Sequence, residues 1–384
     1  MNEKTSVFGN ALIWFGAAVS IAEILTGTLF APLGFWRALA AIVIGHAIGC
    51  VLLYGAGVIG AMDGKSAMEA AKGSFGEKGG QLFAGLNVIQ LLGWTAVMIA
   101  SGAQAAQAAL PLNHGFVIWA VLIALLILVW NMAGIGILQK INILAMILLF
   151  GLSLLLSRLV FKPVTAASGD ATLSFGMALE LSIAMPVSWL PLIADYTSTA
   201  SRPRLASLVS VIVYFVVSCW MYLIGMAAAL YAGEADIAVV MSKAGLGIAA
   251  LLIVILSTVT TTFLDVYSAG ISMQSIRSTL SGKWCAAVAC VIGLVLAVTC
   301  NTSSFENFLY WIGSVFVPMA TVQVMDRLVL KRGNAGKNLI LWCIGFALYR
   351  LFLKLDLSIG STIPDVVATA VVCWIASLIF KPSK

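Results

Sequence analysis

The stretch from Leu256 to Gly270, LSTVTTTFLDVYSAG, brings hydrogen-bonding side chains into an otherwise apolar segment, residues 246–276. Those side chains are hydroxyls followed by one carboxylate: Ser257, Thr258, Thr260, Thr261, Thr262 and Asp265. A carboxylate within hydrocarbon costs several kcal/mol even on lenient insertion scales, so it must face the protein interior or a watery cavity. We therefore expect this stretch to form part of a polar functional site.

A second polar interruption lies near the N-terminus, in ALIWFGAAVSIAEILTGTLF, residues 11–30. Glycine and alanine precede Ser20 and Glu23 there, and such a run before an acid is a place where a helix can unwind and free carbonyl oxygens for a cation. The same small residues would also permit a close helix crossing. Glu23 favours the unwound helix, because packing does not require an acid at mid-membrane depth.

Two tryptophans are placed where a flat ligand could stack. Trp94 falls near the middle of an apolar run, away from the interfacial positions where tryptophan collects, so it either stacks on a ligand or packs in the core. In LELSIAMPVSWLPLIADY, Pro186 and Pro191 each remove a helical hydrogen bond. They predict a broken or kinked helix, with Trp189 between them as a second aromatic wall.

Composition places these stretches in a polytopic membrane protein. Hydrophobic residues make up 62% of the chain, charged residues 9%, and the mean hydropathy is +1.08, whereas globular chains carry about 25% charged residues. The 384 residues match ~12 spans of about 20 residues with short loops. The basic residues are scattered singly and do not indicate a nucleic-acid partner. The expected spans are residues 11–30, 38–59, 80–110, 116–131, 137–160, 173–194, 205–231, 246–276, 284–300, 305–325, 339–353 and 363–380.

The predicted fold is an all-α membrane protein with two inverted repeats of five spans and two additional C-terminal spans. Spans one, three, six and eight carry nearly all the polar interruptions, and inverted repeats with discontinuous first helices place a substrate near the bilayer midplane. The corresponding units are residues 1–160 and 161–330, followed by the two additional spans in 331–384. Most lysines and arginines then fall in inner loops, which places both termini in the cytoplasm.

The pattern resembles the nucleobase:cation symporter-1 family, whose members share the leucine-transporter-like fold. The most specific motifs are WFGAAVSIAE at residues 14–23, LLGW at 91–94 and TTTFLDVYSAG at 260–270. Within that family the chain is most similar to the bacterial hydroxymethylpyrimidine permease subgroup. The resemblance implies a monomeric secondary transporter of the bacterial cytoplasmic membrane, which imports a small heterocycle by cation symport with alternating access. It implies no organic cofactor.

The resemblance also implies a sodium site between spans one and eight. Backbone carbonyls of span one and carbonyl plus hydroxyl oxygens of span eight supply its ligands. The alignment of span eight leaves two positions one residue apart, Leu256 or Ser257, for one of these ligands. Such hard oxygen ligands suit an alkali cation. Carried onto this sequence, the ligands are Gly16, Val19, Leu256, Ser257, Thr260 and Thr261.

The substrate residues implied by the resemblance depart from the family pattern in several places. The stacking tryptophan of span three falls on Trp94. The span-six tryptophan falls near Pro186, with Trp189 about one turn later. A glutamine that binds substrate in some members falls on Met98, and the matching polar position of span one is Ser20. These departures weaken the case for a ligand that needs an amide partner.

Asp265 replaces an asparagine that is frequent in the family and changes the expected substrate. An ionised carboxylate only accepts hydrogen bonds, so Asp265 and Glu23 select a substrate rich in donors. A protonated aminopyrimidine edge presents two parallel donors, and a charge-assisted bidentate pair is stronger than a neutral one. Hydroxymethylpyrimidine, the thiamine precursor, and cytosine both satisfy this requirement, whereas uracil or a hydantoin fits less well.

Proton coupling is the main alternative to sodium coupling. Either Glu23 or Asp265 could carry the proton, because burial favours the neutral form of an unpaired carboxyl group. His46, in IGHAIG, could act as a relay but is more typical of a packing residue with satisfied hydrogen bonds. The sequence contains no HExxH or GxSxG motif that would support a membrane-embedded enzyme, and no repeated selectivity-filter motif that would support a channel.

Overall fold

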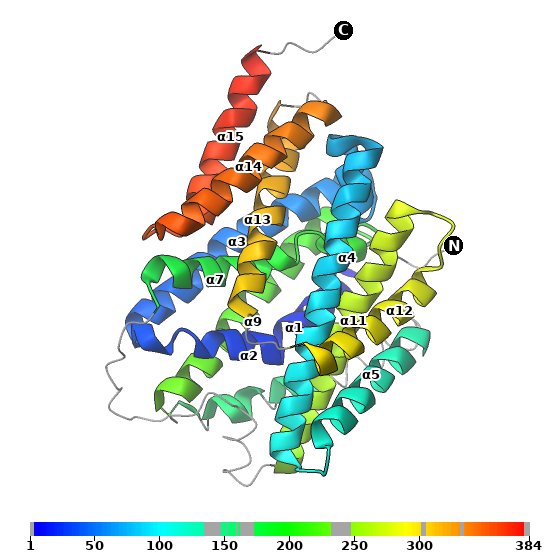
Figure 1. The fold of residues 1–384 in the computed structure, drawn as a ribbon, viewed down its shortest axis with the longest axis vertical. Coiled ribbons are helices and arrows are strands. Elements are labelled where there is room, and N and C mark those ends of the chain that lie inside the picture. The colour runs from blue at the N-terminus through cyan, green and yellow to red at the C-terminus, as the bar shows by residue number, and fades with distance from the viewer. Residues whose placement is uncertain are drawn as a thin grey trace.

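The structure, a computed structural model, is built from helices and describes residues 4–133, 147–161 except 152 and 159, 173–231, 247–300, 305–330 and 334–379 (Figure 1). The helix bounds, in chain order, are α1 Val7–Ala18, α2 Ile21–Thr28, η1 Ala31–Leu33, α3 Phe35–Asp63, α4 Ala67–Ala109, α5 Gly115–Ala133, α7 Phe175–Ser188, α8 Ile193–Thr197, α9 Pro203–Tyr231, α11 Gly247–Ile276, α12 Gly282–Thr299, α13 Phe305–Val324, η3 Met325–Leu330, α14 Ala335–Leu355 and α15 Thr362–Ile379.

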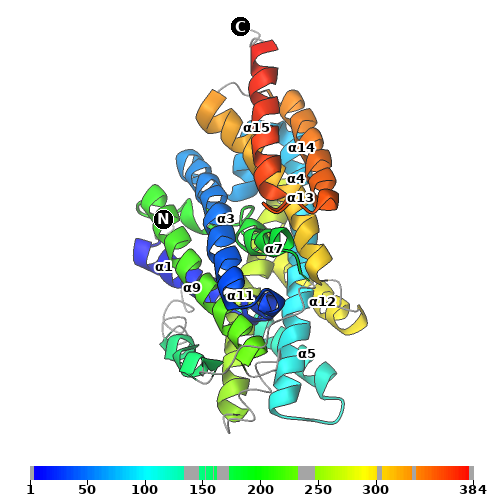
Figure 2. The same cartoon turned by 90° about the vertical axis from the view of Figure 1, so that its left-hand side faces the viewer.

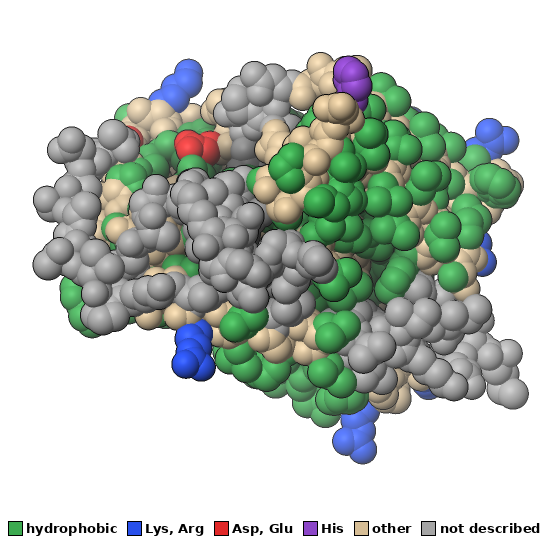
Figure 3. All heavy atoms as spheres, turned by 90° about the horizontal axis from the view of Figure 1, so that it is seen from below, with side chains coloured by type: hydrophobic (Ala, Val, Ile, Leu, Met, Phe, Trp, Pro, Cys, Tyr) green, Lys and Arg blue, Asp and Glu red, His purple; other side chains and the backbone are tan. Residues whose placement is uncertain are grey.

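The all-helical, multi-span architecture predicted from composition is confirmed. Among the described residues, 10 helices are long and apolar enough to cross a membrane, or 11 if the bent pair α1 and α2 counts as one span. The predicted number of twelve is not confirmed, because the expected fifth span, 137–160, lies partly outside the described residues. In the described part of the face seen in Figure 3, hydrophobic side chains dominate, and lysines and arginines stand singly near its margins.

Helix α4 starts earlier than the predicted third span. It begins at Ala67, and the backbone at Gly76 departs from helical geometry with φ 70° and ψ 178°. This conformation is accessible mainly to glycine, so Gly76 separates a short leading helix from the long span that follows. The predicted start at residue 80 was therefore wrong for the helix as a whole but lies close to the start of its spanning part.

Most of the helices form two groups that meet at the centre of the molecule. One group, the bundle, contains α1, α2, α3, α7, α8 and α9; the other, the scaffold, contains α4, α5, α11 and α12 (Figures 1 and 2). The bundle takes the first helices of each proposed repeat, and the scaffold takes helices that follow them. Such a division agrees with two repeats of one topology, while the repeat boundaries at residues 160 and 330 stay predictions.

Both predicted helix breaks are present in the bundle. Helices α1 and α2 meet at an angle of 45° across a short extended connection, and α7 is separated from α8 by a turn that follows Pro186. Close packing holds the first broken helix in place, because a Cβ atom at Gly27 or Gly225 would overlap backbone of the facing helix. The backbones of α2 and α9 therefore approach through glycine, as is common between membrane helices.

The C-terminal helices are fixed to the bundle by one buried acid. Glu180 of α7 is 1% exposed and accepts hydrogen bonds from the backbone N–H groups of Ser361 and Thr362, at 2.7 and 2.8 Å, and from the Thr362 hydroxyl at 2.6 Å. The hydroxyl of Tyr349 in α14 also donates to it. Glu180 therefore serves as an anionic partner for the N-terminus of α15.

Glu180→Gln is expected to lower stability by about 3 kcal/mol, because it weakens several charge-assisted hydrogen bonds and buries an amide N–H₂ group against donors. Thermal unfolding of the purified protein measures this change. Glu306→Gln removes the same charge from an exposed position in the first turn of α13 and serves as the control. Equal unfolding temperatures for the two variants would contradict the assigned role.

Candidate functional site

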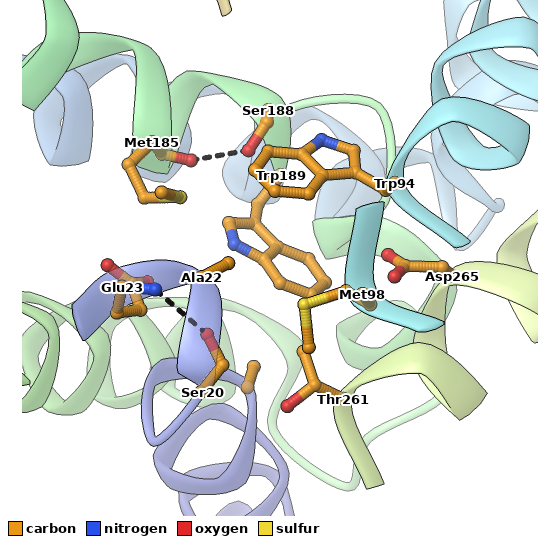
Figure 4. A pocket seen from close by; sticks show the side chains of 11 residues that line it. Ser20, Ala22, Glu23, Trp94, Met98, Met185, Ser188, Trp189, Thr261 and Asp265 are labelled. Atoms are coloured by element: carbon orange, nitrogen blue, oxygen red, sulfur yellow. Dashed lines mark hydrogen bonds between the residues drawn. The ribbon is translucent and has the colours of Figure 1, made fainter. Parts of the chain in front are cut away.

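A small cavity lies where the two helix breaks meet the scaffold. Its walls come from the first broken helix, from α4, from the end of α7 and from α11 (Figure 4). The lining residues are Ala17, Ser20, Ala22, Glu23, Trp94, Met98, Met185, Ser188, Trp189, Thr261 and Asp265. Segments far apart in the sequence thus form one polar and aromatic site.

The first helix break is stabilised by its own serine. Ser20 has an extended backbone, φ −129° and ψ 156°, and its hydroxyl accepts the N–H of Glu23 at 3.3 Å. This is an N-cap, which satisfies one of the N–H groups that a new helix start leaves without a partner. On the other side of the break, the carbonyl of Gly16 accepts a hydrogen bond from the Thr261 hydroxyl at 3.2 Å. That bond joins the bundle to the scaffold.

Amide side chains of α4 support the second break. Gln90 donates to the carbonyl oxygen of Ser188 at 2.8 Å, and Asn87 lies 3.4 Å from the carbonyl oxygen of Pro191. Asn87 also donates to the Ser272 hydroxyl of α11 at 2.8 Å. Carbonyl groups near a break cannot all be paired within the helix, and within a membrane they must find partners in the protein. Gln90 and Asn87 supply such partners.

The two tryptophans of the cavity are held by other aromatic rings. Trp94 packs edge-on against Phe308, with ring centroids 5.6 Å apart, and Trp189 packs edge-on against Trp14 at 5.4 Å. The indole N–H of Trp189 also donates to the hydroxyl of Tyr214 at 3.0 Å. These contacts fix the indoles as rigid walls, and the N–H bond sets the orientation of Trp189.

The two acids of the site differ in their partners and lie on opposite sides of the cavity (Figure 4). The carboxyl oxygens of Glu23 lie 2.7 Å from the hydroxyl oxygens of Tyr214 and Ser218 in α9. Asp265 is 4% exposed, and no hydrogen-bond or ion-pair partner for it occurs in the described part of the chain. Asp265 is thus the acid whose acceptor capacity remains open toward the cavity.

The predicted sodium ligands are brought together only in part. Gly16 and Thr261 are in direct contact, as described above, and Val19 closes the end of α1. On α11, the Thr260 hydroxyl oxygen lies 2.9 and 3.1 Å from the carbonyl oxygens of Leu256 and Ser257, so this side chain faces its own helix. The contact with Gly16 favours Thr261 in the register of this helix, and the sodium site itself stays a prediction.

Of the predicted substrate residues, Ser20, Glu23, Trp94, Met98, Trp189 and Asp265 line the cavity. Pro186 does not line it. A Cβ atom at Gly49 would meet the Pro186 ring, so this proline packs against α3 and acts through the break it causes.

The sequence interpretation missed Met185 and Ser188, which flank the break, and Tyr214 and Ser218 behind Glu23. The spacing of Tyr214 and Ser218 four residues apart in an apolar span places two hydroxyls on one helix face. That spacing was the signal that could have identified them.

The cavity has a volume of about 20 Å³, which is roughly the space that one water molecule needs. A six-membered ring therefore requires the walls to move apart. Met98 and Met185 face the cavity from the scaffold and from the bundle, and methionine side chains change rotamer readily. Methionine rotation, or movement of the bundle against the scaffold, would enlarge the site.

Sequence comparison gives one family that covers most of the chain. The family model described as "Permease for cytosine/purines, uracil, thiamine, allantoin" matches residues 2–341. Cytosine permease of Escherichia coli O157:H7 is 28% identical over 339 residues, which cover 86% of this chain and 79% of that protein.

Structural comparison gives transporters of the same architecture. Mhp1, a nucleobase-cation-symport-1 family transporter solved in a closed conformation with bromovinylhydantoin, superposes with a TM-score of 0.81 at 18% identity over 98% of this chain and 94% of that one. A Na⁺-coupled sialic acid symporter gives a TM-score of 0.76 at 16% identity, over 99% and 91% of the two chains. At these identities the likeness establishes the fold alone.

Gln90→Leu is expected to lower stability by about 1–3 kcal/mol, because it leaves the buried Ser188 carbonyl without its side-chain donor. Gln104→Leu, at an exposed position of the same helix, is the matched control and should unfold close to the wild-type temperature. Thermal unfolding measures both variants. If Gln90→Leu is as stable as the control, the Gln90 bond does not support the break.

Proposed function

The chain belongs to the nucleobase:cation symporter-1 family of permeases, the family described for cytosine/purines, uracil, thiamine and allantoin, and on that premise we propose that it imports a small aminopyrimidine by cation symport. The chain is accordingly a membrane transporter and not an enzyme. Asp265 carries the substrate assignment, since its carboxylate faces a cavity walled by two indoles and has no partner in the described residues.

The chemistry of Asp265 favours an amino edge. A carboxylate has four lone-pair positions and no hydrogen to donate, and a protonated aminopyrimidine offers two parallel N–H groups on one edge. The resulting bidentate pair would be charge-assisted and planar. Uracil presents a carbonyl on each side of its N3–H, so one of its oxygens would face a carboxylate oxygen.

The tryptophans suit the flat ring of such a substrate. Trp94 from the scaffold and Trp189 from the bundle both contribute indole surface to the cavity, and offset stacking on an indole adds about 0.5–1.5 kcal/mol beyond the burial of area. Because the two indoles belong to different helix groups, a ring held by both would favour closure of bundle against scaffold. Substrate binding would thereby promote the alternating-access cycle.

Hydroxymethylpyrimidine is the favoured substrate, and cytosine is the second candidate. The first assignment rests on the resemblance of the motifs to the hydroxymethylpyrimidine permease subgroup, and the second is supported by 28% identity to a cytosine permease. Both molecules carry an exocyclic amine beside a ring nitrogen. Competition between the two for uptake of one labelled compound separates the candidates.

The proposed coupling ion is sodium, bound between the first helix break and α11. The hydrogen bond from Thr261 to the Gly16 carbonyl supports this location, because a cation there would be coordinated by both oxygens and would join bundle to scaffold. Val19, Leu256, Ser257 and Thr260 complete the proposed ligand set. Proton coupling through an acid of the cavity is the alternative.

The proposed setting is the bacterial inner membrane, with both termini cytoplasmic and the protein monomeric.

Asp265→Asn is expected to weaken uptake of labelled hydroxymethylpyrimidine about 30-fold or more, because an amide replaces one acceptor oxygen with a donor. Sodium binding should change little, since Asp265 lies outside the proposed ligand set. Uptake into proteoliposomes and the sodium dependence of binding measure the two effects. Asp365→Asn, a buried acid of α15 outside the cavity lining, is the control. Equal losses of substrate and sodium binding would contradict the assignment.

Thr261→Ala is expected to raise the sodium concentration for half-maximal uptake about tenfold, a change of ~1.4 kcal/mol, whereas Thr261→Ser should retain near-wild-type dependence. Thr262→Ala is the control, because its hydroxyl is buried on the same helix and makes no hydrogen bond within the described residues. Uptake that ignores sodium and collapses with a protonophore would instead assign coupling to protons.

A further inference from the structure

Glu23 is the end of a buried polar chain that runs from the cavity into the bundle. Its carboxyl oxygens contact the hydroxyls of Tyr214 and Ser218. The Ser218 oxygen in turn lies 2.7 Å from Nε2 of His46 in α3. Ser218 therefore connects Glu23 to His46 directly, and the side chains at both ends of this path are at most 1% exposed.

The far nitrogen of His46 faces two oxygens. Its Nδ1 lies 3.0 Å from the carbonyl oxygen of Ile42 and 2.8 Å from the hydroxyl oxygen of Ser182 in α7. The Ser182 hydroxyl also donates to that same carbonyl at 2.8 Å. A carbonyl has no hydrogen, and a hydroxyl has one, so Ser182 cannot donate to Ile42 and to His46 at once. These contacts are satisfied together only if Nδ1 carries a hydrogen.

We propose that Glu23, Ser218 and His46 form a hydrogen-bonded unit with no net charge. Compared with an ionised Glu23 beside a neutral His46, this unit holds one additional proton. Two arrangements meet this condition. In the first, Glu23 is protonated and donates to Ser218, which donates to Nε2. In the second, Nε2 of an imidazolium donates to Ser218, which donates to a Glu23 carboxylate. Transfer along the two hydrogen bonds interconverts them, with no proton gained or lost.

The alternative with an ionised Glu23 and a neutral His46 is disfavoured by geometry. Nε2 would then have to donate to Ser218, and the bare lone pair of Nδ1 would face the Ile42 carbonyl at 3.0 Å. Glu23 also has no ion pair with lysine or arginine in the described ranges of the chain. A lone negative charge buried there would carry a large desolvation cost. The extra proton removes this cost.

Other titratable groups near the unit are uncharged at neutral pH in their ordinary forms. They are Tyr214, Cys219 and Tyr222 of α9 and Cys50 of α3. The Tyr222 ring packs edge-on against the imidazole of His46, with centroids 4.6 Å apart and planes at 83°. None of these groups supplies a cation for Glu23, so the compensating proton is the one within the unit.

His46 therefore acts as a positioning residue for the substrate cavity. It fixes the hydrogen of Ser218 relative to Glu23, and Glu23 holds the Tyr214 hydroxyl that receives the indole N–H of Trp189. Because the additional proton balances the charge of Glu23, Asp265 is the acid that remains to interact with a positively charged edge of the substrate. This last step rests on the proposed function; the proton assignment does not.

The assignment can be tested without substrate, because the chain contains only 2 histidines. His114→Gln removes the exposed one and leaves His46 as the single source of imidazole signals. Nitrogen-15 NMR of histidine-labelled His114→Gln protein in lipid bilayers at neutral pH should show a protonated Nδ1. A spectrum of the neutral tautomer that is protonated only at Nε2 would overturn the proposal. Failure of hydroxymethylpyrimidine uptake would leave this result unaffected.

Glu23→Gln in the same background locates the shared proton. The glutamine amide can donate to Ser218 as a protonated glutamate would, so His46 should then be neutral with its hydrogen on Nδ1. If the His46 spectrum is unchanged, the shared proton lies on Glu23 in the His114→Gln parent. If the signal of a protonated Nε2 disappears, the shared proton lies on His46 in that parent. Either result supports the proposed unit. Appearance of the Nε2-protonated neutral tautomer in Glu23→Gln would contradict the hydrogen assignment at Ser182 and Ile42.

Ser218→Ala provides a matched test of the connection. It removes the bridging hydroxyl, so the Nε2 signal of His46 should shift. Ser210→Ala, on the same helix, removes a buried hydroxyl without a hydrogen-bond partner among the described residues and should leave the His46 spectrum unchanged. Identical spectra for the two variants would show that Ser218 does not connect His46 to Glu23, even if both proteins fold normally.

Discussion

The structure depends on satisfying polar groups at two helix breaks without water. A membrane helix pairs its backbone groups internally, so each interruption creates groups that the surrounding protein must satisfy. Ser20 caps the start of α2, Thr261 donates to the Gly16 carbonyl, and Gln90 donates to the Ser188 carbonyl. Thr261 and Gln90 belong to the scaffold, whereas the breaks belong to the bundle. The same bonds that make the breaks tolerable therefore also hold the two helix groups together.

This arrangement explains why a binding cavity forms at that depth. Broken helices cannot pack side by side along their full length, and small residues such as Ala17 and Ala22 leave room beside the break. The scaffold contributes Trp94 and Asp265, and the bundle contributes Trp189. A ligand between them touches both groups, so relative movement of bundle and scaffold necessarily changes its contacts. Binding and conformational change are thereby coupled through shared walls.

Three buried acids illustrate how differently a membrane protein can accommodate a carboxyl group. Glu180 is surrounded by donors from α14 and the start of α15, and its role is to join the C-terminal helices to the bundle. Glu23 ends a chain of hydroxyls and an imidazole. Asp265 has no protein partner in the described part of the chain and lines the cavity. Only the last of these arrangements leaves a strong acceptor for a ligand.

The membrane class, the positions of both helix breaks and most of the residues that line the cavity could be predicted from the amino-acid sequence. Hydropathy indicates which segments lie in lipid, and a proline removes a helical hydrogen bond wherever it occurs. A polar residue within an apolar span must face the protein interior or a cavity. Ser20, Trp94 and Asp265 could be identified for these local reasons. The contact partners of these residues became evident only from the three-dimensional arrangement of the helices. It separated Glu23 from Asp265, placed Pro186 against α3, and gave Glu180 a capping role, because such contacts depend on which faces of distant helices meet and not on spacing along the chain.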